Sequence, residues 1–332
     1  MPRFRTATVS ALLAERPGLQ RVETTEGRAY VLTQVVPPVA VGDAVVLNTT
    51  AVDLGLGTGG WHVVHWNLAV RDWDGPSGGH IVKLRYTSLQ ADTGAAEEHV
   101  GELVAGGPDG LPDALGSMPV VVCTLHSQAA VVATVLRHLL AGATIAYVMT
   151  DGAALPIALS DVVAQLRERG VLDATVTAGH AFGGDHEAVS IAGALVLARR
   201  HVEADVTVVG MGPGVVGTGT LLGTTALEAA SVADTTAALG GRPVLCARVS
   251  DGDGRERHQG LSHHSATVAS LVRTPEVPMP MPGEVAEVPD VAAVLDAAGI
   301  GVTTMGRGPA EDPGFFAACG AAATLAAGLV GG

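Results

Sequence analysis

The sequence contains few aromatic and few charged residues. In a chain of 332 residues, 3% are aromatic and 16% are charged, whereas 48% are hydrophobic and 44 residues are glycine. A chain this apolar can bury a large core, so the composition excludes an intrinsically disordered protein. With so few aromatics, the core must be built from Val, Ala and Leu, which suits closely packed layers of sheet and helix. The length allows one large domain or two modest ones.

Basic residues are also scarce. The chain has 19 Lys and Arg residues against 33 Asp and Glu residues, which gives a formal net charge of −14. Proteins that bind nucleic acids or anionic membranes usually present a basic face. The charge therefore argues against DNA, RNA or a membrane as the main partner, and the scarcity of aromatics argues against a base-stacking surface.

Long apolar runs and paired cysteines are absent from the sequence as well. No run of about 18 or more strongly apolar residues predicts a membrane span. The first ten residues, MPRFRTATVS, lack the apolar core of a signal peptide. The three cysteines, Cys123, Cys246 and Cys319, are far apart and fall in predicted strands and a predicted helix, which is typical of buried, reduced cysteines. We therefore expect a cytoplasmic protein.

Residues 1–100 predict a small β-rich domain. Two β-rich runs flank Glu26-Gly27, which indicates a hairpin, and further strands are expected at 44–47, 61–68 and 80–89. Short strands separated by glycine-rich turns are typical of a small barrel or sandwich. Residues 101–117, with two prolines and several glycines, predict a linker or exposed loop.

From residue 118 to 332 the pattern changes to alternating strands and helices. The apolar runs are continuous, which indicates strands buried on both faces in a mostly parallel sheet. Right-handed crossovers would then place helices on both faces, so we expect an α/β, Rossmann-like domain that carries a ligand site. The predicted strands are 119–125, 143–150, 173–179, 204–210, 242–250, 266–274 and 301–306, and the predicted helices are 129–141, 154–170, 185–200, 222–239, 290–299 and 312–329.

Polar residues follow the predicted strands, whereas the connections from helix back to strand are plainer. In an open parallel sheet, ligands bind beyond the carboxyl ends of the strands. Histidine moves protons near neutral pH, and aspartate orients a hydroxyl group or a metal ion. The candidate catalytic residues at this edge are His126, Asp151, Asp185, His258 and His263.

A glycine-rich loop follows the strand predicted at 204–210. Gly212, Gly214 and Gly217 fit G-x-G-x-x-G, and Thr218, Gly219 and Thr220 extend the loop. Such a loop can cradle a phosphate or carboxylate with backbone amides, or it can be purely structural. It follows the fourth strand of the domain rather than the first, and no acid stands at the end of the next strand. NAD(P) is therefore not expected as a cofactor.

A basic island lies in the segment RERHQGLSHH, residues 255–264. Arg255 and Arg257, together with Arg307 after the last predicted strand, predict an anion clamp, and the histidines predict a proton-transfer group. The alternative is a solvated loop with incidental charges. His263 and His264 are adjacent in an expected extended segment, so only one of the two rings is expected to face the site.

Other candidates carry weaker signals. Gly152, His180 and His186 follow predicted strands, and Asp185 could simply cap a helix. A divalent metal site formed by the set Asp151, Asp185, His186 and Glu187 and shared with His126 or His263 stays open, although no tight local ligand spacing supports it. In the β-rich part, the loop 48–60 is either a structural turn or a flap that brings Thr49 and Asp53 to the ligand.

Several of these loops resemble a known family. The stretches are LNTTAVDLGLGTGG, GHIVKLRYTSLQ, LHSQ, YVMTDGAALPIALS, TAGHAFGGDHEAV, MGPGVVGTGT, RERHQGLSHH and TTMGR. Together they resemble an uncharacterised bacterial family, domain of unknown function family 3866. The resemblance implies soluble bacterial proteins of this length and supplies no activity.

The residue chemistry favours an enzyme, a hydrolase or transferase, that acts on a small anionic metabolite: phosphorylated, nucleotide-like or a carboxylate. Two alternatives stay open, a non-catalytic binding or sensor protein and an NAD(P)-dependent oxidoreductase. The low charge content also predicts a homodimer.

Overall fold

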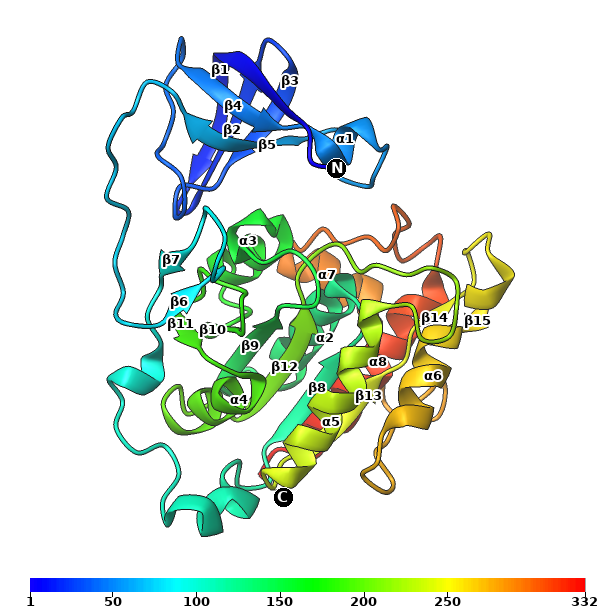
Figure 1. The fold of residues 1–332 in the computed structure, drawn as a ribbon. Helices are drawn as coiled ribbons and strands as arrows, with labels where there is room; N and C mark the ends of the chain where they lie inside the picture. The colour runs from blue at the N-terminus through cyan, green and yellow to red at the C-terminus, as the bar shows by residue number, and fades with distance from the viewer. Residues whose placement is uncertain (332) are drawn as a thin grey trace. The chain divides into compact units, whose positions relative to one another are not determined.

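The computed structural model describes residues 1–331 and consists of two compact units, Met1–Gly94 and Ala95–Gly332 (Figure 1). None of the helices within the described residues is both long and apolar enough to cross a membrane. Each unit is considered by itself below.

The first unit contains a closed five-stranded barrel, which confirms the predicted small barrel. The strands are ordered β1-β2-β3-β5-β4, and alternate side chains such as Val22 and Leu47 are fully buried inside. Gly27 has a φ of +109° in the tight β2–β3 turn at the predicted hairpin. The elements of this unit are β1 (Phe4–Arg16), β2 (Leu19–Thr24), β3 (Gly27–Val31), β4 (Ala44–Asn48), α1 (Thr50–Asp53), β5 (His62–Asn67), β6 (Val82–Lys83) and β7 (Ala91–Asp92).

The strand predicted over residues 80–89 is wrong. Only the two residues of β6 are extended there, paired with β7, because Leu84 and Tyr86 adopt positive φ values of 53° and 62°. Those backbone conformations end a strand. The long first strand β1 was not predicted, since most of its side chains are exposed and it lacks a buried alternation.

The second unit is built on a six-stranded parallel sheet with the order β11-β10-β9-β12-β8-β13. Its central strands are buried on both faces, which explains their continuous apolar sequences. Five of the predicted strands are confirmed. The strands are β8 (Pro119–Cys123), β9 (Ile145–Thr150), β10 (Ala174–Ala178), β11 (His186–Ala188), β12 (Val206–Met211) and β13 (Arg242–Cys246), with a separate ribbon of β14 (Val249–Ser250) and β15 (Gly260–Leu261).

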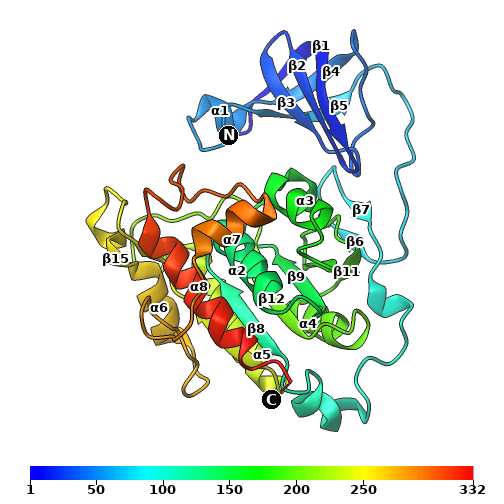
Figure 2. The same cartoon turned by 180° about the vertical axis from the view of Figure 1, so that it is seen from behind.

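Helices cover both faces of this sheet. One hydrophobic core lies under α2, α3, α7 and α8, and a second lies under α4, α5 and α6; Figure 2 shows α2, α7 and α8 on the near side, and Figure 1 shows α4 and α5. The helices are α2 (His126–Leu139), α3 (Asp161–Glu168), α4 (Ile191–Arg200), α5 (Glu228–Ala238), α6 (His263–Leu271), α7 (Val291–Ala298) and α8 (Pro313–Ala327).

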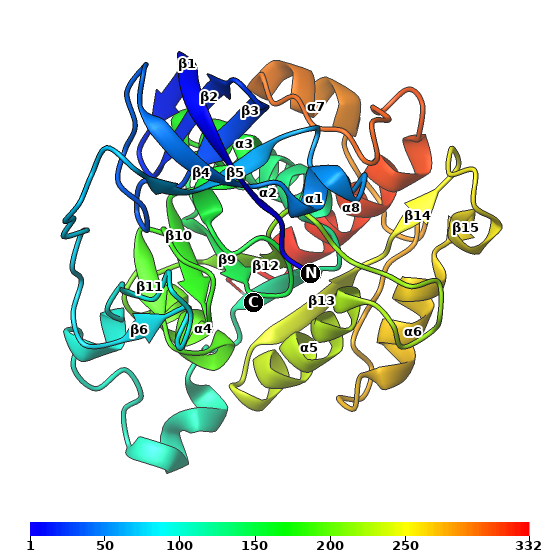
Figure 3. The same ribbon diagram turned by 45° about the horizontal axis from the view of Figure 1, so that its top comes forward.

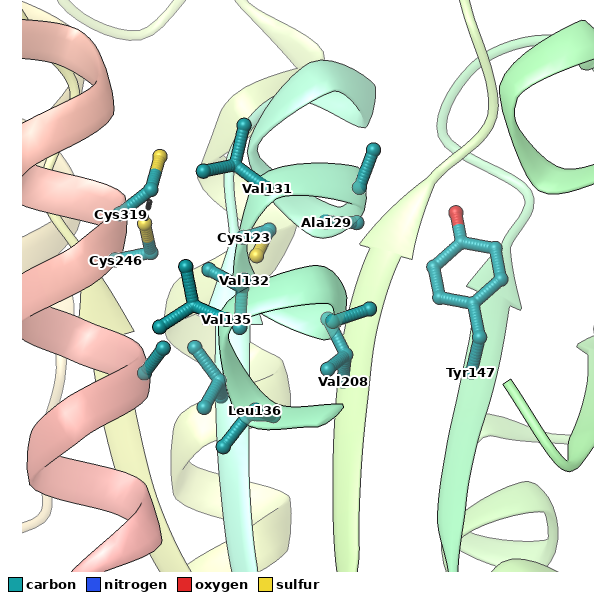
Figure 4. Packing of buried hydrophobic residues seen from close by; sticks show 14 of the residues in the cluster. Cys123, Ala129, Val131, Val132, Val135, Leu136, Tyr147, Val208, Cys246 and Cys319 are labelled. Carbon is teal, nitrogen blue, oxygen red and sulfur yellow. Dashed lines mark hydrogen bonds between the residues drawn. The ribbon is translucent and has the colours of Figure 1, made fainter. Parts of the chain in front are cut away.

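Small and β-branched side chains allow these layers to pack closely. Val131 and Val135 of α2 are fully buried between the sheet and α8 (Figure 4). All three cysteines are buried and free, and the Sγ atoms of Cys246 and Cys319 lie 3.8 Å apart. With so few aromatics, the core is filled mostly by Val, Ala and Leu, as the composition predicts.

The connections that follow the two neighbouring strands β8 and β12 cross the sheet in opposite directions and on opposite faces. From β8 the chain passes through α2 on one face to β9, whereas from β12 it passes through α5 on the other face to β13. Because β8 and β12 are neighbours, the loops that follow them diverge and leave a crevice at their carboxyl ends. Such a switch point is where open α/β sheets bind ligands.

Three predictions in this unit are wrong. Residues 266–274 lie mainly in helix α6, not a strand, and Ser262 caps this helix by accepting the His264 N–H. Residues 301–306 form no strand and contribute only a bridge between Thr304 and Arg307. The helix predicted from Asp185 is preceded by strand β11 and begins at Ile191. These segments are short or mix apolar with small polar residues, so their sequences do not distinguish helix, strand and loop.

Residues 95–117 differ from the expected linker. Ala114 and Leu115 are fully buried in the core under α4 and α5, and Leu115 N–H donates to the Leu239 carbonyl. Two 3₁₀ segments, Ala96–Glu98 and Gly107–Asp113, lie within this stretch. The second unit therefore begins at Ala95 rather than at Met118.

Candidate functional site

A cavity of about 160 Å³ lies at the switch point, beyond the carboxyl ends of β8, β12 and β13. This volume has room for a small anion. Three arginines and two histidines contribute, and no carboxylate is found among the lining residues described. The lining residues are Leu125, Val215, Val216, Gly217, Gly219, Arg248, Arg255, Arg257, His258, His264 and Met305.

The glycine-rich loop forms one wall. A Cβ atom on Gly217 would lie 3.3 Å from Cε1 of His264, and one on Gly219 would lie 3.7 Å from Cζ of Arg257. A side chain on Gly217 would crowd the imidazole, and Gly219 has a φ of +84°, a backbone conformation that favours glycine. The loop runs toward α6, as Figure 3 shows, so the two segments with the most distinctive sequences do meet.

The loop is not a simple phosphate cradle before a helix. It folds back on itself as a small hairpin, in which Thr218 N–H donates to the Gly223 carbonyl and the hydroxyls of Thr218 and Thr220 lie 3.0 Å apart. Helix α5 begins only at Glu228. Gly212 packs against the Ala154 carbonyl instead of facing the cavity, where a Cβ would come within 2.3 Å. Gly214, with a φ of +102°, serves the turn.

The opposite wall is basic and rigidly held. Arg255 donates two hydrogen bonds to Asp253, of 2.9 and 2.7 Å, and Arg248 lies 3.4 Å from the same carboxylate. Asp253 is 3% exposed, and its Arg255 hydrogen bonds hold its pKa well below the usual range. This buried carboxylate therefore fixes two guanidinium groups at the cavity.

Arg307 belongs to the support of this wall. It donates to the fully buried Asp312 at 2.9 Å and lies 3.6 Å from Asp253, and it does not line the cavity. Arg257 differs from the other three arginines, since no carboxylate within the described part of the chain pairs with it. The two buried carboxylates thus do not balance the four guanidinium groups, and the wall keeps an excess of positive charge.

Three histidines cluster beside the arginines. The ring centroids of His258 and His264 are 5.0 Å apart, and those of His263 and His264 are 4.2 Å apart. As expected, only one ring of the adjacent pair lines the cavity, that of His264, but the two residues begin helix α6 instead of lying in the extended segment that was expected. One potential ligand nitrogen from each ring lies within 4.8 Å of the others.

Burial and, after it, the positive surroundings lower the pKa values of these imidazoles and favour their neutral form. Burial, and then the nearby arginines, lower the pKa of His258 to about 4. Burial, then His263 and the arginines, lower the pKa of His264 to about 4 as well. The pKa of His263 is lowered by the same causes. Neutral imidazoles can accept a proton or bind a metal ion.

His126 lies near the crevice but is fully bonded. Its Nδ1 donates to the Met211 carbonyl at 3.0 Å, since a carbonyl can only accept, and its Nε2 accepts from the Ser160 hydroxyl at 2.6 Å. Burial lowers the pKa of this imidazole to about 4. His126 therefore joins the end of β12 to the starts of α2 and α3.

A second polar group lies at the carboxyl ends of β9 and β10. Asp151 accepts from the His180 N–H at 3.0 Å, and Glu228 accepts from the Thr150 hydroxyl. Burial, and then the charge of Asp151, raise the pKa of Glu228. Gly152 allows this approach, because a Cβ there would lie 2.5 Å from Glu228 Oε2. These groups do not line the cavity.

Asp185 and His186 lie away from this edge. The loop after β10 returns the chain to the middle of that strand, where β11 begins beside Val176. Asp185 accepts from Thr175 N–H at 2.8 Å and pairs with Arg167 at 3.1 Å. His186 packs against His201 with ring centroids 4.9 Å apart. Both residues are expected at the carboxyl edge, but the parallel pairing of β11 with β10 places them beside Thr175 and Val176, before the carboxyl end of β10.

A family model described as Protein of unknown function (DUF3866) matches residues 28–287. The chain belongs to this family. The DUF3866 match includes the cavity residues from Leu125 to His264, whereas Met305 and the supporting Arg307 lie outside it. Searches of curated proteins and of solved structures found no match.

Within the DUF3866 region, sequence reasoning missed three residues. Arg248 lies two residues beyond the end of β13 but inside the longer strand predicted over 242–250, so the rule that selects residues after each strand passes over it. Asp253 and Glu228 gave no signal, since their roles depend on which side chains the fold brings to them. Thr49 and Asp53 belong to the first unit, where the Thr49 hydroxyl donates to Asp53 at 3.0 Å; their contact with a ligand stays a prediction.

Proposed function

We propose that this protein is an enzyme, a hydrolase or transferase, that binds a small anionic metabolite in the switch-point cavity. One observation carries the proposal: Arg248, Arg255 and Arg257 line a cavity to which no described carboxylate contributes. Guanidinium groups bind phosphate and carboxylate through paired, charge-assisted hydrogen bonds. An anion would supply the negative charge that this wall lacks.

The roles of the arginines differ. Arg255 is bound by Asp253 through two hydrogen bonds, so it contributes a fixed positive charge. Arg257 keeps its donors available, and Gly219 packs against its guanidinium group. Arg257 is therefore the residue that we expect to bind the anion directly, opposite the glycine-rich loop.

The histidines supply the proton transfer. His264 lines the cavity, and its Nδ1 has no hydrogen-bond partner among the residues described. A neutral imidazole beside bound substrate can take a proton from an attacking water or hydroxyl group. This favours hydrolysis or group transfer over hydride transfer.

The fold supports the same proposal. The doubly wound sheet favours the finer description of the second unit as Rossmann-like, although in sheet numbering its strand order is 4-3-2-5-1-6. The glycine-rich loop follows β12, late in the chain, and does not lead straight into a helix. NAD(P) chemistry therefore receives little support.

Binding of orthophosphate, carboxylates and nucleotides, measured by calorimetry, tests the proposal. We expect Arg257→Gln to weaken the best anion by about 10-fold or more, which corresponds to the loss of one charge-assisted interaction. Arg71→Gln, at an exposed arginine of the first unit, is the matched control and should bind as the unmodified protein does. If no anion binds, or if the Arg257 variant binds normally, the proposal fails.

Turnover separates an enzyme from a sensor. With phosphate esters and nucleotides as substrates, His264→Ala should abolish product release by an enzyme. In a sensor, the same change would alter only affinity.

A further inference from the structure

A cluster of three imidazoles, two of them buried, lies at the edge of the cavity, and anion binding by the arginines alone does not explain it. His258 is 2% exposed and His264 is 6% exposed, and both line the cavity. His263 packs between them and solvent, with ring centroids 5.0 Å and 4.2 Å from theirs. Burial of imidazole nitrogens that have no hydrogen-bond partner costs free energy unless a ligand binds to them.

The nitrogens of the cluster point to a ligand. His263 Nε2 and His264 Nδ1 are buried and lack a hydrogen-bond partner among the described residues. His258 Nδ1 lies 2.8 Å from Ser262 Oγ. With the proton on Nδ1, this bond leaves the lone pair of Nε2 available, and histidines that bind metals are typically oriented in this way by their second nitrogen.

We propose that His258, His263 and His264 bind one divalent transition-metal ion of the zinc class. Three ligand nitrogens, one from each ring, lie within 4.8 Å of one another. A tetrahedral ion with bonds of about 2.0–2.1 Å needs nitrogens about 3.4 Å apart, so the rings close in by about 1.4 Å at most. Imidazole ligands select zinc, cobalt, copper or nickel rather than magnesium or calcium.

The local fold brings these ligands together. His258 ends a short 3₁₀ turn, the chain reverses at Gly260 with a φ of +60°, and Ser262 starts helix α6. His263 and His264 then stand on the first turn of α6, facing back toward His258. The spacing H-x₄-H-H therefore becomes a compact site only because residues after Ser262 are helical.

Three protein ligands leave one position of a tetrahedral ion open, as in catalytic zinc sites. With a metal bound, His264 would be a ligand and could no longer accept a proton, so water held at the open position would replace the imidazole as the group that loses a proton. His258 and His264 line the cavity, so this position faces the space between Arg257 and the glycine-rich loop. The positive charges of the nearby arginines lower the affinity for a cation. The charges of Arg248 and Arg255 are partly offset, because both side chains pair with Asp253. An anion bound in the cavity would complete the coordination; this last step alone rests on the proposed function.

Cobalt binding to the full chain tests the site. After treatment with a chelator, Co²⁺ should bind once per chain and give the intense visible absorption of tetrahedral cobalt. His264→Ala and the less buried His263→Ala should each weaken binding by at least about 100-fold, since loss of an outer partner alone costs 10–100-fold. The control is His201→Ala, because His201 belongs to a separate pair of packed imidazoles.

Each outcome decides the proposal. Absence of one-to-one binding, octahedral absorption alone, or unchanged binding in both His263→Ala and His264→Ala overturns it. Circular dichroism of the metal-free variants separates loss of ligands from loss of fold, and His263→Ala, at the partly exposed ring, is the variant that decides if His264→Ala does not fold.

Orthophosphate binding with and without metal separates this inference from the proposed function. Phosphate binding that needs Arg257, together with a failure to bind Co²⁺, overturns the inference and leaves the proposed function standing. Metal binding by the three histidines without binding of any anion supports the inference and overturns the proposed function.

Discussion

Gly217 controls how closely the glycine-rich loop approaches His264. Its φ does not require glycine, but a methyl group there would lie 3.3 Å from Cε1 of the imidazole. We expect Gly217→Ala to weaken phosphate binding several-fold and to leave the unfolding midpoint nearly unchanged, because the residue is exposed. Gly142→Ala is the control, since a Cβ at Gly142 meets nothing within 4 Å. Equal affinities for the two variants in calorimetry would contradict this interpretation of the loop.

At the same scale, the sequence could predict much of the cavity. Gly217, Gly219, Arg255, Arg257, His258 and His264 were selected because they follow strands at the carboxyl edge, and all six line it. Asp253 could not be predicted, because its role comes from a buried position between arginines. The pairing of His263 with His264 was also missed, because it depends on a helix where a strand was expected.

Helices α7 and α8 pack closely because Gly320 lacks a side chain. A Cβ at this buried position would come within 2.7 Å of Val291 Cγ2 and 2.9 Å of Val288 Cγ1. We expect Gly320→Val to lower the free energy of unfolding by about 1–3 kcal/mol, the usual cost of overpacking. Urea denaturation measures it, and Gly328→Ala, near the end of α8 with ordinary contacts, should change it by less than about 0.5 kcal/mol. A neutral Gly320→Val would show that the helices can move apart freely.

Elements of the second unit were predictable where burial on both faces made the pattern unambiguous. Strands β8, β9 and β12 have buried side chains at every position, so their apolar runs had one interpretation. Helix α6 was not predicted, because ATVASLV, with its β-branched residues, also suits a strand. Its only distinguishing signal was the capping serine, Ser262.

For the whole molecule, His126 couples stability to pH. Its pKa is about 4 in the folded protein, because of burial, and about 6.5 in an unfolded chain. The unfolded state therefore binds a proton first as the pH falls, so full stability is present above pH 6.5 and is lost progressively toward pH 4. One such group changes the free energy of unfolding by about 1.4 kcal/mol per pH unit within that window.

His126→Asn removes this pH dependence. Both proteins retain the other buried histidines, so the difference between their free energies of unfolding at each pH reports on His126 alone. Far-UV circular dichroism is the suitable probe, because every α-helix except the four-residue α1 lies in the second unit. Urea titrations should show a variant that is less stable at pH 7, where the bonds to Met211 and Ser160 are lost, but whose stability falls less steeply between pH 6.5 and 4. Parallel curves for the two proteins would mean that His126 takes up its proton without unfolding the chain.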